Sequence, residues 1–411
     1  MKEFIMAQQN GRSIPLEDKI FGISRLANEM IAKKGKEAVT NATIGALLDD
    51  QGKLVVLSSV VEVLRNLTPE DYAEYAPIGG TPEFKKCIKQ AAFGKYKPNC
   101  YTEAVATPGG TGAIRNTIAN YSKIGDQILT SDWFWANYSS IAGELGRTST
   151  TFSLFDKERN FNITAFKEKV EELLSKQESL VIIINTPAHN PTGYSLTLED
   201  WDNLLEAVKS AAKEDKKVTL LVDVAYIDFA GDPDKYREFL PKLEALQDNI
   251  LPIISYSASK TFTLYGMRCA AMICMTPVKE IAEEFVRVCQ FSSRASWSNC
   301  TRASMVVLSK IYEDSGLLAK VNEERSFYCD LLLKRGKAFE EEAAKVGLEI
   351  VPFDAGFFAS IPCDDPDAIS KKLQEEGIFL VPLAKGLRVS IASITEEKCR
   401  MLPEKILAAM K

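Results

Sequence analysis

Histidine is nearly absent from this chain of 411 residues, which restricts the metal sites that the chain can build. His189 is the single histidine, and the nine cysteines contain no Cys-x-x-Cys pair. Zinc sites draw on clustered histidine and cysteine ligands at short spacings. An odd, scattered set of cysteines is typical of reduced thiols in a cytosolic protein. We therefore expect no metal centre of this kind and no framework of disulfides.

Long hydrophobic runs and an excess of positive charge are also missing. No window approaches the roughly 18 uninterrupted apolar residues of a membrane span, and the opening residues 1–5 include an acidic side chain, so we expect no targeting or membrane segment. Lys and Arg number 50 against 56 Asp and Glu, a formal charge of −6, so no basic field attracts nucleic acid. We expect a cytoplasmic protein without nucleic-acid or membrane partners.

The hydrophobic and charged fractions, 46% and 26%, are those of an ordinary globular protein. Between about residues 100 and 275, short β-rich apolar runs alternate with helix-compatible segments, which predicts an α/β core around a largely parallel sheet. The clearest strands are expected over residues 179–185, 218–223, 250–256 and 269–275. Ligand sites in open α/β sheets lie at the carboxyl ends of the strands, so we expect the functional site there.

The remaining segments predict a second, smaller α+β unit. We expect an amphipathic helix over residues 198–215 capped by Thr197, and a helical region over 276–345 that includes a long connecting helix. Further strands are expected over residues 348–353, 356–361, 378–381 and 387–391. This gives an N-terminal arm with part of the small domain (1–54), a large domain (55–325) and a small C-terminal domain (326–411).

A lysine at the end of one predicted strand is the first candidate for chemistry. Residues 255–260 are Ser-Tyr-Ser-Ala-Ser-Lys, and Arg268 follows eight positions after Lys260. An amine set among hydroxyls and near a guanidinium can have its pKa lowered by desolvation and by the neighbouring cation, which suits it to Schiff-base chemistry. The alternative is an ordinary exposed loop lysine.

Two further polar motifs follow predicted strands. Asp223 and Tyr226 stand at the end of the strand predicted over 218–223. A buried carboxylate there requires a partner, although an ordinary hydrogen-bonded strand end is the alternative. Asn190 lies in the run His-Asn-Pro-Thr-Gly, whose turn dipeptides make either a tight connection or a rigid support for an asparagine facing a cofactor.

A glycine-rich turn, Gly-Gly-Thr-Gly at residues 109–112, opens a predicted helix. Backbone N–H groups and the helix dipole at such a turn favour a phosphate, although a purely structural turn is the alternative. The turn lacks the Gly-Lys-Ser/Thr ending of a Walker loop and the third glycine of the dinucleotide pattern.

Taken in their order along the chain, the four motifs resemble those of the fold-type I pyridoxal phosphate aminotransferases, specifically the aspartate/aromatic amino-acid aminotransferase family. The resemblance covers nearly the whole chain, from Asp-Lys-Ile-Phe-Gly at residues 18–22 through Asn-Ala-Thr-Ile-Gly at 41–45 to Gly-Leu-Arg-Val-Ser at 386–390. It implies a mostly parallel central sheet sandwiched by helices, a smaller α+β domain, pyridoxal 5′-phosphate as cofactor, and a homodimer with shared active sites.

The resemblance also implies roles for the matched residues. Lys260 would hold the cofactor as a Schiff base and then move the substrate proton, helped by Asp223 at the ring nitrogen and by Tyr226 with Asn190 at the phenolic oxygen. Trp135 would stack on the ring, and Tyr75 would reach the phosphate of the neighbouring subunit. The residues implied for the phosphate cup are Gly110, Thr111, Ser257, Ser259 and Arg268.

For the substrate, the resemblance implies that Arg388 binds the α-carboxylate, beside Gly45, Trp135 and Asn190. Arg294 would reach across the dimer to a distal carboxylate, which predicts aspartate or glutamate with 2-oxoglutarate or oxaloacetate in a ping-pong reaction. Three residues depart from the usual family pattern: Tyr138 stands where histidine is often found, Ser390 where asparagine is usual, and Ala258, between Ser257 and Ser259, makes the phosphate loop one residue longer than in some members. We give His189 no catalytic role.

The arginine that Arg294 matches also occurs in family members that accept aromatic substrates. An aromatic amino-acid aminotransferase that uses tyrosine or phenylalanine therefore stays open. So do a decarboxylase or lyase on the same scaffold, and a regulatory protein that keeps the cofactor fold without turnover.

Overall fold

The computed structural model describes residues 6–10 and 12–411, so residues 1–5, used above in the targeting argument, lie outside it. The helices are α1 (Lys19–Lys34), α2 (Ser58–Arg65), α3 (Pro69–Ala73), α4 (Pro82–Phe93), α5 (Gly109–Tyr121), α6 (Asn137–Glu144), α7 (Ile163–Lys176), α8 (Leu198–Ala211), α9 (Ala258–Thr261), α10 (Lys279–Ser296), α11 (Arg302–Glu313), α12 (Ser315–Val346), α13 (Pro366–Glu375) and α14 (Glu396–Met410). Within the described residues, no helix is long and apolar enough to cross a membrane.

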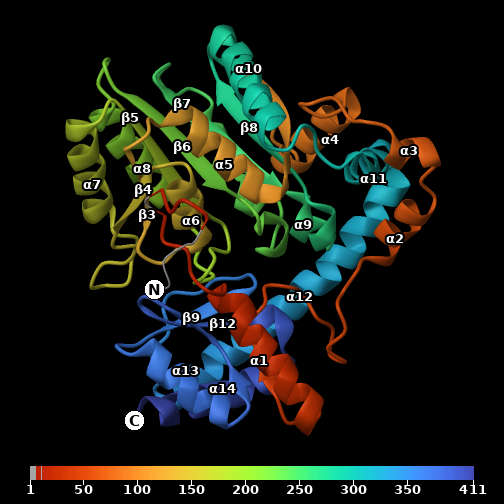
Figure 1. The fold of residues 1–411 in the computed structure, drawn as a ribbon, viewed down its shortest axis with the longest axis vertical. Helices are drawn as coiled ribbons and strands as arrows, with labels where there is room; N and C mark the ends of the chain where they lie inside the picture. Colours follow the sequence, from red (N-terminus) through yellow and green to blue (C-terminus); the bar gives the residue numbers. More distant parts are fainter. Residues whose placement is uncertain (1–5, 11) are drawn as a thin grey trace.

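A seven-stranded sheet forms the centre of the larger part of the molecule (Figure 1). Its strands, in spatial order, are β2 (Tyr101–Pro108), β8 (Cys269–Thr276), β7 (Ile250–Ser257), β6 (Lys217–Asp223), β5 (Ser179–Asn185), β3 (Gln127–Ser131) and β4 (Thr148–Phe152). β8 is antiparallel to both of its neighbours, and the pairs from β7 to β4 are parallel. The expected α/β fold with a mostly parallel sheet is confirmed.

Helices cover both faces of this sheet, as the apolar runs of its strands require. Successive side chains of a strand point to opposite faces, and in β5 they enter two separate cores. Ile182 belongs to the core that contains Trp201 of α8, whereas Val181 and Ile183 belong to the core that contains Ile114 of α5. The sheet is therefore sandwiched between helices.

The register of the parallel strands aligns three polar strand ends. Asn185 of β5 pairs with Asp223 of β6, which pairs in turn with Ser255 of β7. Upstream of these positions the strands are mainly apolar, and beyond their first residues they are buried on both faces. The carboxyl edge of the sheet thus gathers the polar groups that follow the strands.

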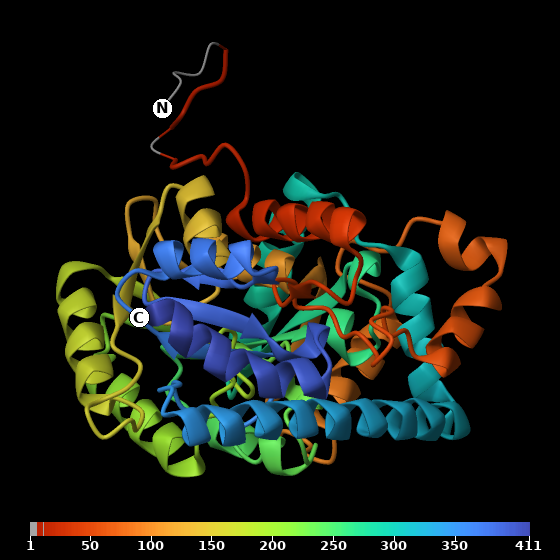
Figure 2. The same ribbon diagram turned by 90° about the horizontal axis from the view of Figure 1, so that it is seen from below.

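The C-terminal part forms a second unit with its own core. β9 (Phe358–Pro362), β12 (Gly386–Ser390) and β11 (Val381–Leu383) make an antiparallel sheet, and β1 (Thr40–Asn41) pairs in parallel with β10 (Ile378–Phe379). The N-terminal segment therefore joins this unit, which Figure 1 shows at the opposite end from the central sheet. Helix α12, 32 residues long, runs along one side of the molecule in Figure 2. The division at residues 54 and 325 stays a proposal, with position 325 inside α12.

The expected strand over residues 348–353 is wrong. Leu348 and Val351 are buried, which explains the apolar pattern, but the segment has no strand pairing along its length. Only Val351 donates a ladder-like backbone hydrogen bond, to the Ser360 carbonyl at 3.0 Å, within the backbone contacts recorded for the described chain. Burial without a paired neighbour makes an extended connection rather than a strand.

Two helical expectations need correction in their extent. Thr197 caps α8 as expected, but the helix ends at Ala211 rather than at residue 215, because Ala212 has a ψ of 75°, outside the helical range, and only the charged residues Lys213, Glu214 and Asp215 follow it. The helical region over 276–345 is divided into α10, α11 and α12. Asp314 starts α12 by accepting hydrogen bonds from the N–H groups of Gly316 and Leu317, so a side-chain cap separates it from α11.

Candidate active site

Lys260 lies on the short helix α9, directly after strand β7 at the carboxyl edge of the sheet. The Ser257 hydroxyl caps this helix by accepting a hydrogen bond from the N–H of Ser259 at 3.3 Å. The Lys260 amine donates to the Gly45 carbonyl at 2.8 Å. This bond joins residues 215 positions apart and places the N-terminal segment over the strand ends.

The surroundings of Lys260 favour its neutral form. Burial, and after it the positive charges of the Arg268 and Arg388 guanidinium groups, lowers the pKa of the Lys260 amine to about 7. A lysine with this pKa is largely available as a nucleophile and base near neutrality. The amine is held against a carbonyl, so the alternative of a freely exposed loop lysine does not describe it.

We predict that the Lys260 amine, in the chain without cofactor, titrates near pH 7. A small acylating reagent attacks only the neutral amine, so its reaction rate at Lys260 should rise with pH and level off above about pH 8, while exposed lysines keep gaining reactivity to beyond pH 10. Mass spectrometry of the Lys260 peptide across a pH series measures this. A half-point near pH 10 would contradict the effect of burial.

Asp223 provides a buried carboxylate at the end of β6. The Tyr138 hydroxyl donates to its Oδ2 at 2.7 Å, and the N–H of Ala225 donates to its Oδ1 at 3.3 Å. Burial raises the pKa of Asp223 to about 6, while these two hydrogen bonds act in the lowering direction. Trp135 meets the Tyr138 ring edge-on, with centroids 5.6 Å apart. The carboxylate is only partly satisfied and can accept a cationic N–H group.

Arg388 is a buried guanidinium on β12. Its Nη2 donates to the Thr43 carbonyl at 2.7 Å and its Nη1 to Asn190 Oδ1 at 3.3 Å, while Nε has no hydrogen-bond partner among the described residues. The guanidinium carbon lies 4.2 Å from the centroid of the Phe358 ring. Burial lowers the pKa of Arg388 to about 10. Among the described residues no carboxylate forms an ion pair with Arg388, and a buried cation in that situation favours the binding of an anion.

Tyr226 is buried where the charges of both Asp223 and Arg388 act on its hydroxyl. Burial raises the pKa of the Tyr226 hydroxyl well above its ordinary value, against the lowering influence of Arg388 and of a hydrogen bond with Asn190. The hydroxyl therefore stays protonated near neutrality and can donate a hydrogen bond to an oxygen anion. Asn190 is itself held through its backbone N–H, which donates to Asn185 Oδ1 at 2.7 Å.

The side chain of Arg268 turns toward the start of helix α5. Its Nη1 donates to the Tyr265 carbonyl at 2.9 Å and to Ser259 Oγ at 3.4 Å. A Cβ atom at Gly109, whose φ is +73°, would stand 2.2 Å from Arg268 Nη2. Glycine is required here because it adopts positive φ freely and lets the guanidinium approach the helix N-terminus.

Gly110 and Thr111 lie in the first turn of α5, and Gly110 faces serine side chains of β7. A Cβ built on Gly110 would come within 3.6 Å of Ser255 Oγ and 3.8 Å of Ser257 Cβ. The Ser255 hydroxyl is buried and lacks a hydrogen-bond partner in the described part of the chain. Free N–H groups of a helix N-terminus, hydroxyls and a guanidinium together fit a phosphate group.

Tyr75 and Arg294 lie elsewhere on the surface. Tyr75 is 89% exposed, and Arg294, at the end of α10, donates to Ser298 Oγ. The Asn299 side chain donates to the Ala76 carbonyl at 3.2 Å, which brings their two segments together. No hydrogen bond recorded for residues 6–10 and 12–411 links either residue to Lys260.

Sequence reasoning missed several residues of this site. Ser255 was within reach, because it lies in the quoted motif and ends the buried part of β7. Tyr265, whose ring centroid is 4.6 Å from Lys260 Nζ, and Phe358 under Arg388 gave no signal in the pattern. His189 is buried beside Thr192, its ring Nδ1 2.8 Å from the Thr192 hydroxyl, and burial lowers its pKa to about 3, so it stays neutral.

The fold and the site together define an enzyme of the fold-type I architecture, with a lysine, a buried carboxylate and arginines at the carboxyl edge of the sheet. Residues 37–406 match the family model for "Aminotransferase class I and II". The chain belongs to this family of aminotransferases, and the family resemblance seen in the motifs is confirmed.

Individual relatives agree with this membership. The aspartate aminotransferase of Escherichia coli (strain K12) is 26% identical over 381 residues, covering 90% of this chain and 93% of that protein. The crystal structure of an aminotransferase from Anaerococcus prevotii superposes with a TM-score of 0.96 at 39% identity, covering 99% of this chain and 100% of the other. An aromatic-amino-acid aminotransferase from Burkholderia pseudomallei, covalently bound to pyridoxal phosphate, shares the fold, with a TM-score of 0.80, 19% identity and coverage of 99% and 100%.

Proposed function

We propose that this aminotransferase moves amino groups between aspartate or glutamate and the oxo acids 2-oxoglutarate and oxaloacetate, with pyridoxal 5′-phosphate as its cofactor. The observation that supports this most is the Lys260 amine, with a pKa of about 7, set at a sheet edge that also presents Asp223 and Arg388. The two half-reactions would alternate in a ping-pong sequence.

The residues present fit this cofactor. The Ser255 hydroxyl of β7 is buried, lacks a hydrogen-bond partner among the described residues and faces Gly110 at the start of α5. This supports a phosphate cradle there, to be formed by Gly110, Thr111, Ser257, Ser259 and Arg268. Asp223 would face the ring nitrogen, Tyr226 and Asn190 the phenolic oxygen, and Trp135 the ring itself. When bound, the cofactor supplies the electron sink that stabilises negative charge at the substrate Cα.

Lys260 would then do the proton transfer. Its amine, with a pKa of about 7, is available in neutral form near neutrality and would take the proton from the substrate Cα and then deliver it to the C4′ carbon of the cofactor. The Gly45 carbonyl, which accepts a hydrogen bond from Lys260 Nζ at 2.8 Å, orients the amine. Asp223 is ionised above its pKa of about 6, and its negative charge would keep the ring nitrogen of the cofactor protonated through the reaction.

Arg388 would bind the substrate α-carboxylate. Its Nη1 and Nη2 are already directed by Asn190 and Thr43, which fixes the plane of the guanidinium before substrate arrives. Ser390, in place of the usual asparagine, donates to the Ile44 carbonyl at 2.8 Å and so ties β12 to the segment before Gly45. Gly45 would lie beside the bound substrate.

We also propose a homodimer with shared active sites. Tyr75 and Arg294 are exposed in a single chain and come from adjoining surface segments, as expected of residues that serve a neighbour. Tyr75 would reach the neighbour's phosphate and Arg294 the distal carboxylate of the neighbour's substrate. Small amino acids and oxo acids would be the other partners.

The nine cysteines bear on the compartment. All nine have free thiols, and seven of them are buried, which supports a reducing environment. We therefore place the enzyme in the cytoplasm.

The absorbance spectrum of the purified protein tests the proposed function directly. L-aspartate, L-glutamate, L-tyrosine and L-phenylalanine are added separately, without any oxo acid, and loss of the visible absorbance of the bound cofactor marks the half-reaction. We expect aspartate or glutamate to bleach the band. Bleaching by tyrosine or phenylalanine alone would favour an aromatic amino-acid aminotransferase, and no change with any of the four would favour a lyase, a decarboxylase or a protein without turnover.

Replacing Arg294 by alanine should separate the substrate classes. If Arg294 binds a distal carboxylate, Arg294→Ala loses about 100-fold in kcat/KM with aspartate but little with phenylalanine, because only the dicarboxylate loses a charged partner. Steady-state kinetics with both donors measure this. The control is Arg287→Ala, an exposed arginine on the same helix, α10. Equal losses with the two donors would rule out a distal-carboxylate role for Arg294.

A further inference from the structure

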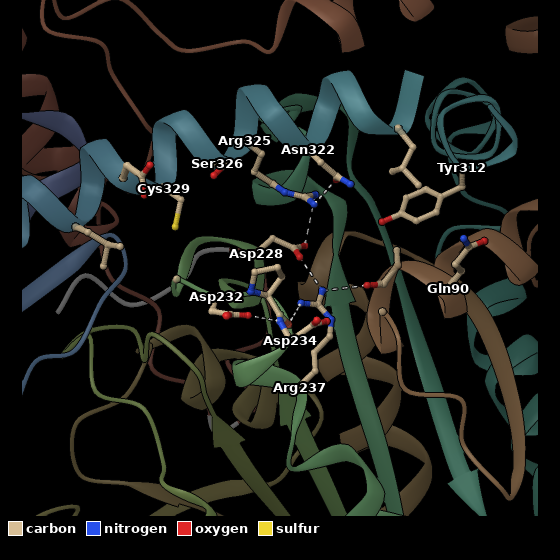
Figure 3. Close-up of a pocket in the computed structure, with 17 residues that line it drawn as sticks. Gln90, Asp228, Asp232, Asp234, Arg237, Tyr312, Asn322, Arg325, Ser326 and Cys329 are labelled. Carbon is tan, nitrogen blue, oxygen red and sulfur yellow. Dashed lines mark hydrogen bonds and ion pairs between the residues drawn. The ribbon is translucent and has the colours of Figure 1, made fainter. Parts of the chain in front are cut away.

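Asp228 is a buried carboxylate for which the reaction above has no use. It lies in the 3-10 turn η1 (Ile227–Phe229), two residues after Tyr226, and its side chain is 3% exposed. Figure 3 shows it between Arg237 and Arg325 at the wall of a cavity of about 680 Å³. An ionised side chain this deeply buried is costly unless several groups bind it.

Two of the groups that bind Asp228 flank Lys260 in the sequence. The Tyr256 hydroxyl, on β7, donates to Asp228 Oδ2 at 2.7 Å. The Thr261 hydroxyl, on the residue directly after Lys260, donates to the same oxygen at 2.6 Å. The segment that carries Lys260 is therefore fastened on both sides to one carboxylate.

Two arginines keep that carboxylate charged. Arg237 Nη2 donates to Asp228 Oδ1 at 2.6 Å, and Arg325 Nη1 lies 4.0 Å from Oδ2. Burial acts to raise the pKa of Asp228, but the two guanidinium groups and the hydroxyls outweigh it and hold that pKa well below its ordinary value. Hydrogen bonds to a charged acceptor are about twice as strong as those to a neutral one, so the hold on Tyr256 and Thr261 is firm.

The arginines also fix the carboxylate to the scaffold. Arg237 donates further to the carbonyls of Ala91 and Ala92 in α4, at 3.0 Å each, and Arg325 belongs to the long helix α12. Asp228 is thus placed by two helices that lie outside the sheet edge. Because Tyr256 and Thr261 donate hydrogen bonds to Asp228, the turn that carries Lys260 is held in place relative to those two helices.

We propose that Asp228 is a positioning residue of the active site, whose carboxylate sets where the Lys260 amine points by holding Tyr256 and Thr261. This inference rests on the proposed role of Lys260 as the proton carrier. A displacement of about 1 Å in a reacting group costs on the order of 100-fold in rate, so loss of this hold lowers kcat while the binding of the substrate carboxylate by Arg388 persists.

The variant Thr261→Val tests the proposal, because it removes one donor to Asp228 and keeps the shape of the side chain and both arginines. Its matched control is Thr130→Val: Thr130 and Thr261 are each 2% exposed, and the Thr130 hydroxyl donates to the Ile183 carbonyl, away from Asp228. With the donor that best bleaches the cofactor, we expect Thr261→Val to lose about ten- to 100-fold in kcat with KM within about twofold of wild type. Thr130→Val keeps both constants.

A second readout does not depend on turnover. In the chain without cofactor, acylation of Lys260, followed by mass spectrometry at pH 7, should proceed several-fold faster in Thr261→Val than in wild type or Thr130→Val, because the amine is less firmly held. Asp228→Asn should change the rate in the same direction. The Asp228→Asn variant also removes the anion that two buried arginines bind, and this endangers folding. The result with Thr261→Val is therefore the decisive one.

Unchanged kcat and unchanged Lys260 labelling in Thr261→Val would overturn the positioning role. The same losses in Thr130→Val would do so too, because they would reflect the general cost of removing a buried hydroxyl. A wild-type chain that binds the cofactor but does not transaminate would instead refute the proposed function, and the labelling comparison would still decide what Asp228 does to Lys260.

Discussion

Replacing Lys260 by alanine is expected to abolish transamination and leave a folded protein. Removal of a group that acts directly on the reacting atoms costs on the order of 10⁵- to 10⁶-fold in kcat. The fold should persist, because the Lys260 amine makes a single hydrogen bond within the described structure, to the Gly45 carbonyl, and burial disfavours its charged form. Turnover with saturating donor measures the first effect, and thermal unfolding followed by circular dichroism measures the second.

Lys89→Ala is the matched control for this variant. Lys89 is also half-buried, and its amine donates to a backbone carbonyl, that of Thr102, at 3.0 Å, but it lies on α4 away from the sheet edge. It should lose no more than twofold in kcat. Transamination retained by Lys260→Ala, or lost equally in Lys89→Ala, would remove the central residue from the proposed mechanism.

The carboxyl edge of the sheet was the part of the site that sequence could predict best. Strands β5, β6 and β7 are apolar runs that end in polar residues, so their type and their ends follow from local pattern alone. Once they are parallel neighbours, Asn185, Asp223 and Ser255 must fall side by side. That alignment is enough to predict where chemistry gathers.

The partners of these residues could not be predicted in the same way. Lys260 binds the carbonyl of Gly45, 215 positions away, and Arg388 binds the carbonyl of Thr43, 345 positions away. Contacts at such separations depend on how the two units pack, and the local spacing of apolar and polar residues does not predict them. The roles of Gly45 and Arg388 came from the family resemblance, because the motifs of a family occur together with the packing of its fold.

The errors have the same origin. The segment over residues 348–353 has the apolar content of a strand, yet its neighbours in space offer it no continuous pairing. Asp228, between Ile227 and Phe229, gives no signal of its own in the sequence, and its role is visible only once the fold brings Tyr256, Thr261 and Arg237 to it. A buried charge cluster forms only in the tertiary structure. A single sequence therefore contains its residues but does not show that they lie in contact.

Replacing Asp223 by asparagine is the second change for which we expect a large effect, a loss of about 1,000-fold in kcat/KM. The amide keeps the size of the side chain and can still accept from Tyr138, but it is neutral and cannot stabilise a positive charge at the ring nitrogen, an electrostatic contribution of the kind worth about 10²- to 10³-fold. Kinetics with the best donor, and the absorbance of the bound cofactor, measure the loss.

The fold should not suffer from this substitution, and the pKa of Asp223 gives the reason. Burial raises that pKa from its ordinary value to about 6, so at pH 7 the ionised carboxylate is less favourable in the folded chain than in the unfolded one, and this cost is absent below both pKa values. A neutral amide removes the cost, so Asp223→Asn should unfold at the same temperature as wild type, or higher, at pH 7. An activity loss therefore cannot be attributed to unfolding.

Tyr138→Phe completes the argument for Asp223, because it removes the hydrogen bond and leaves the charge. That bond acts to lower the pKa of Asp223, so the variant should raise this pKa and shift the acidic limb of the pH–rate profile to higher pH. A supporting group of this kind is worth about ten- to 100-fold, less than the charge itself. If Tyr138→Phe matched Asp223→Asn in its loss at every pH, then hydrogen bonding rather than the negative charge would be what Asp223 contributes.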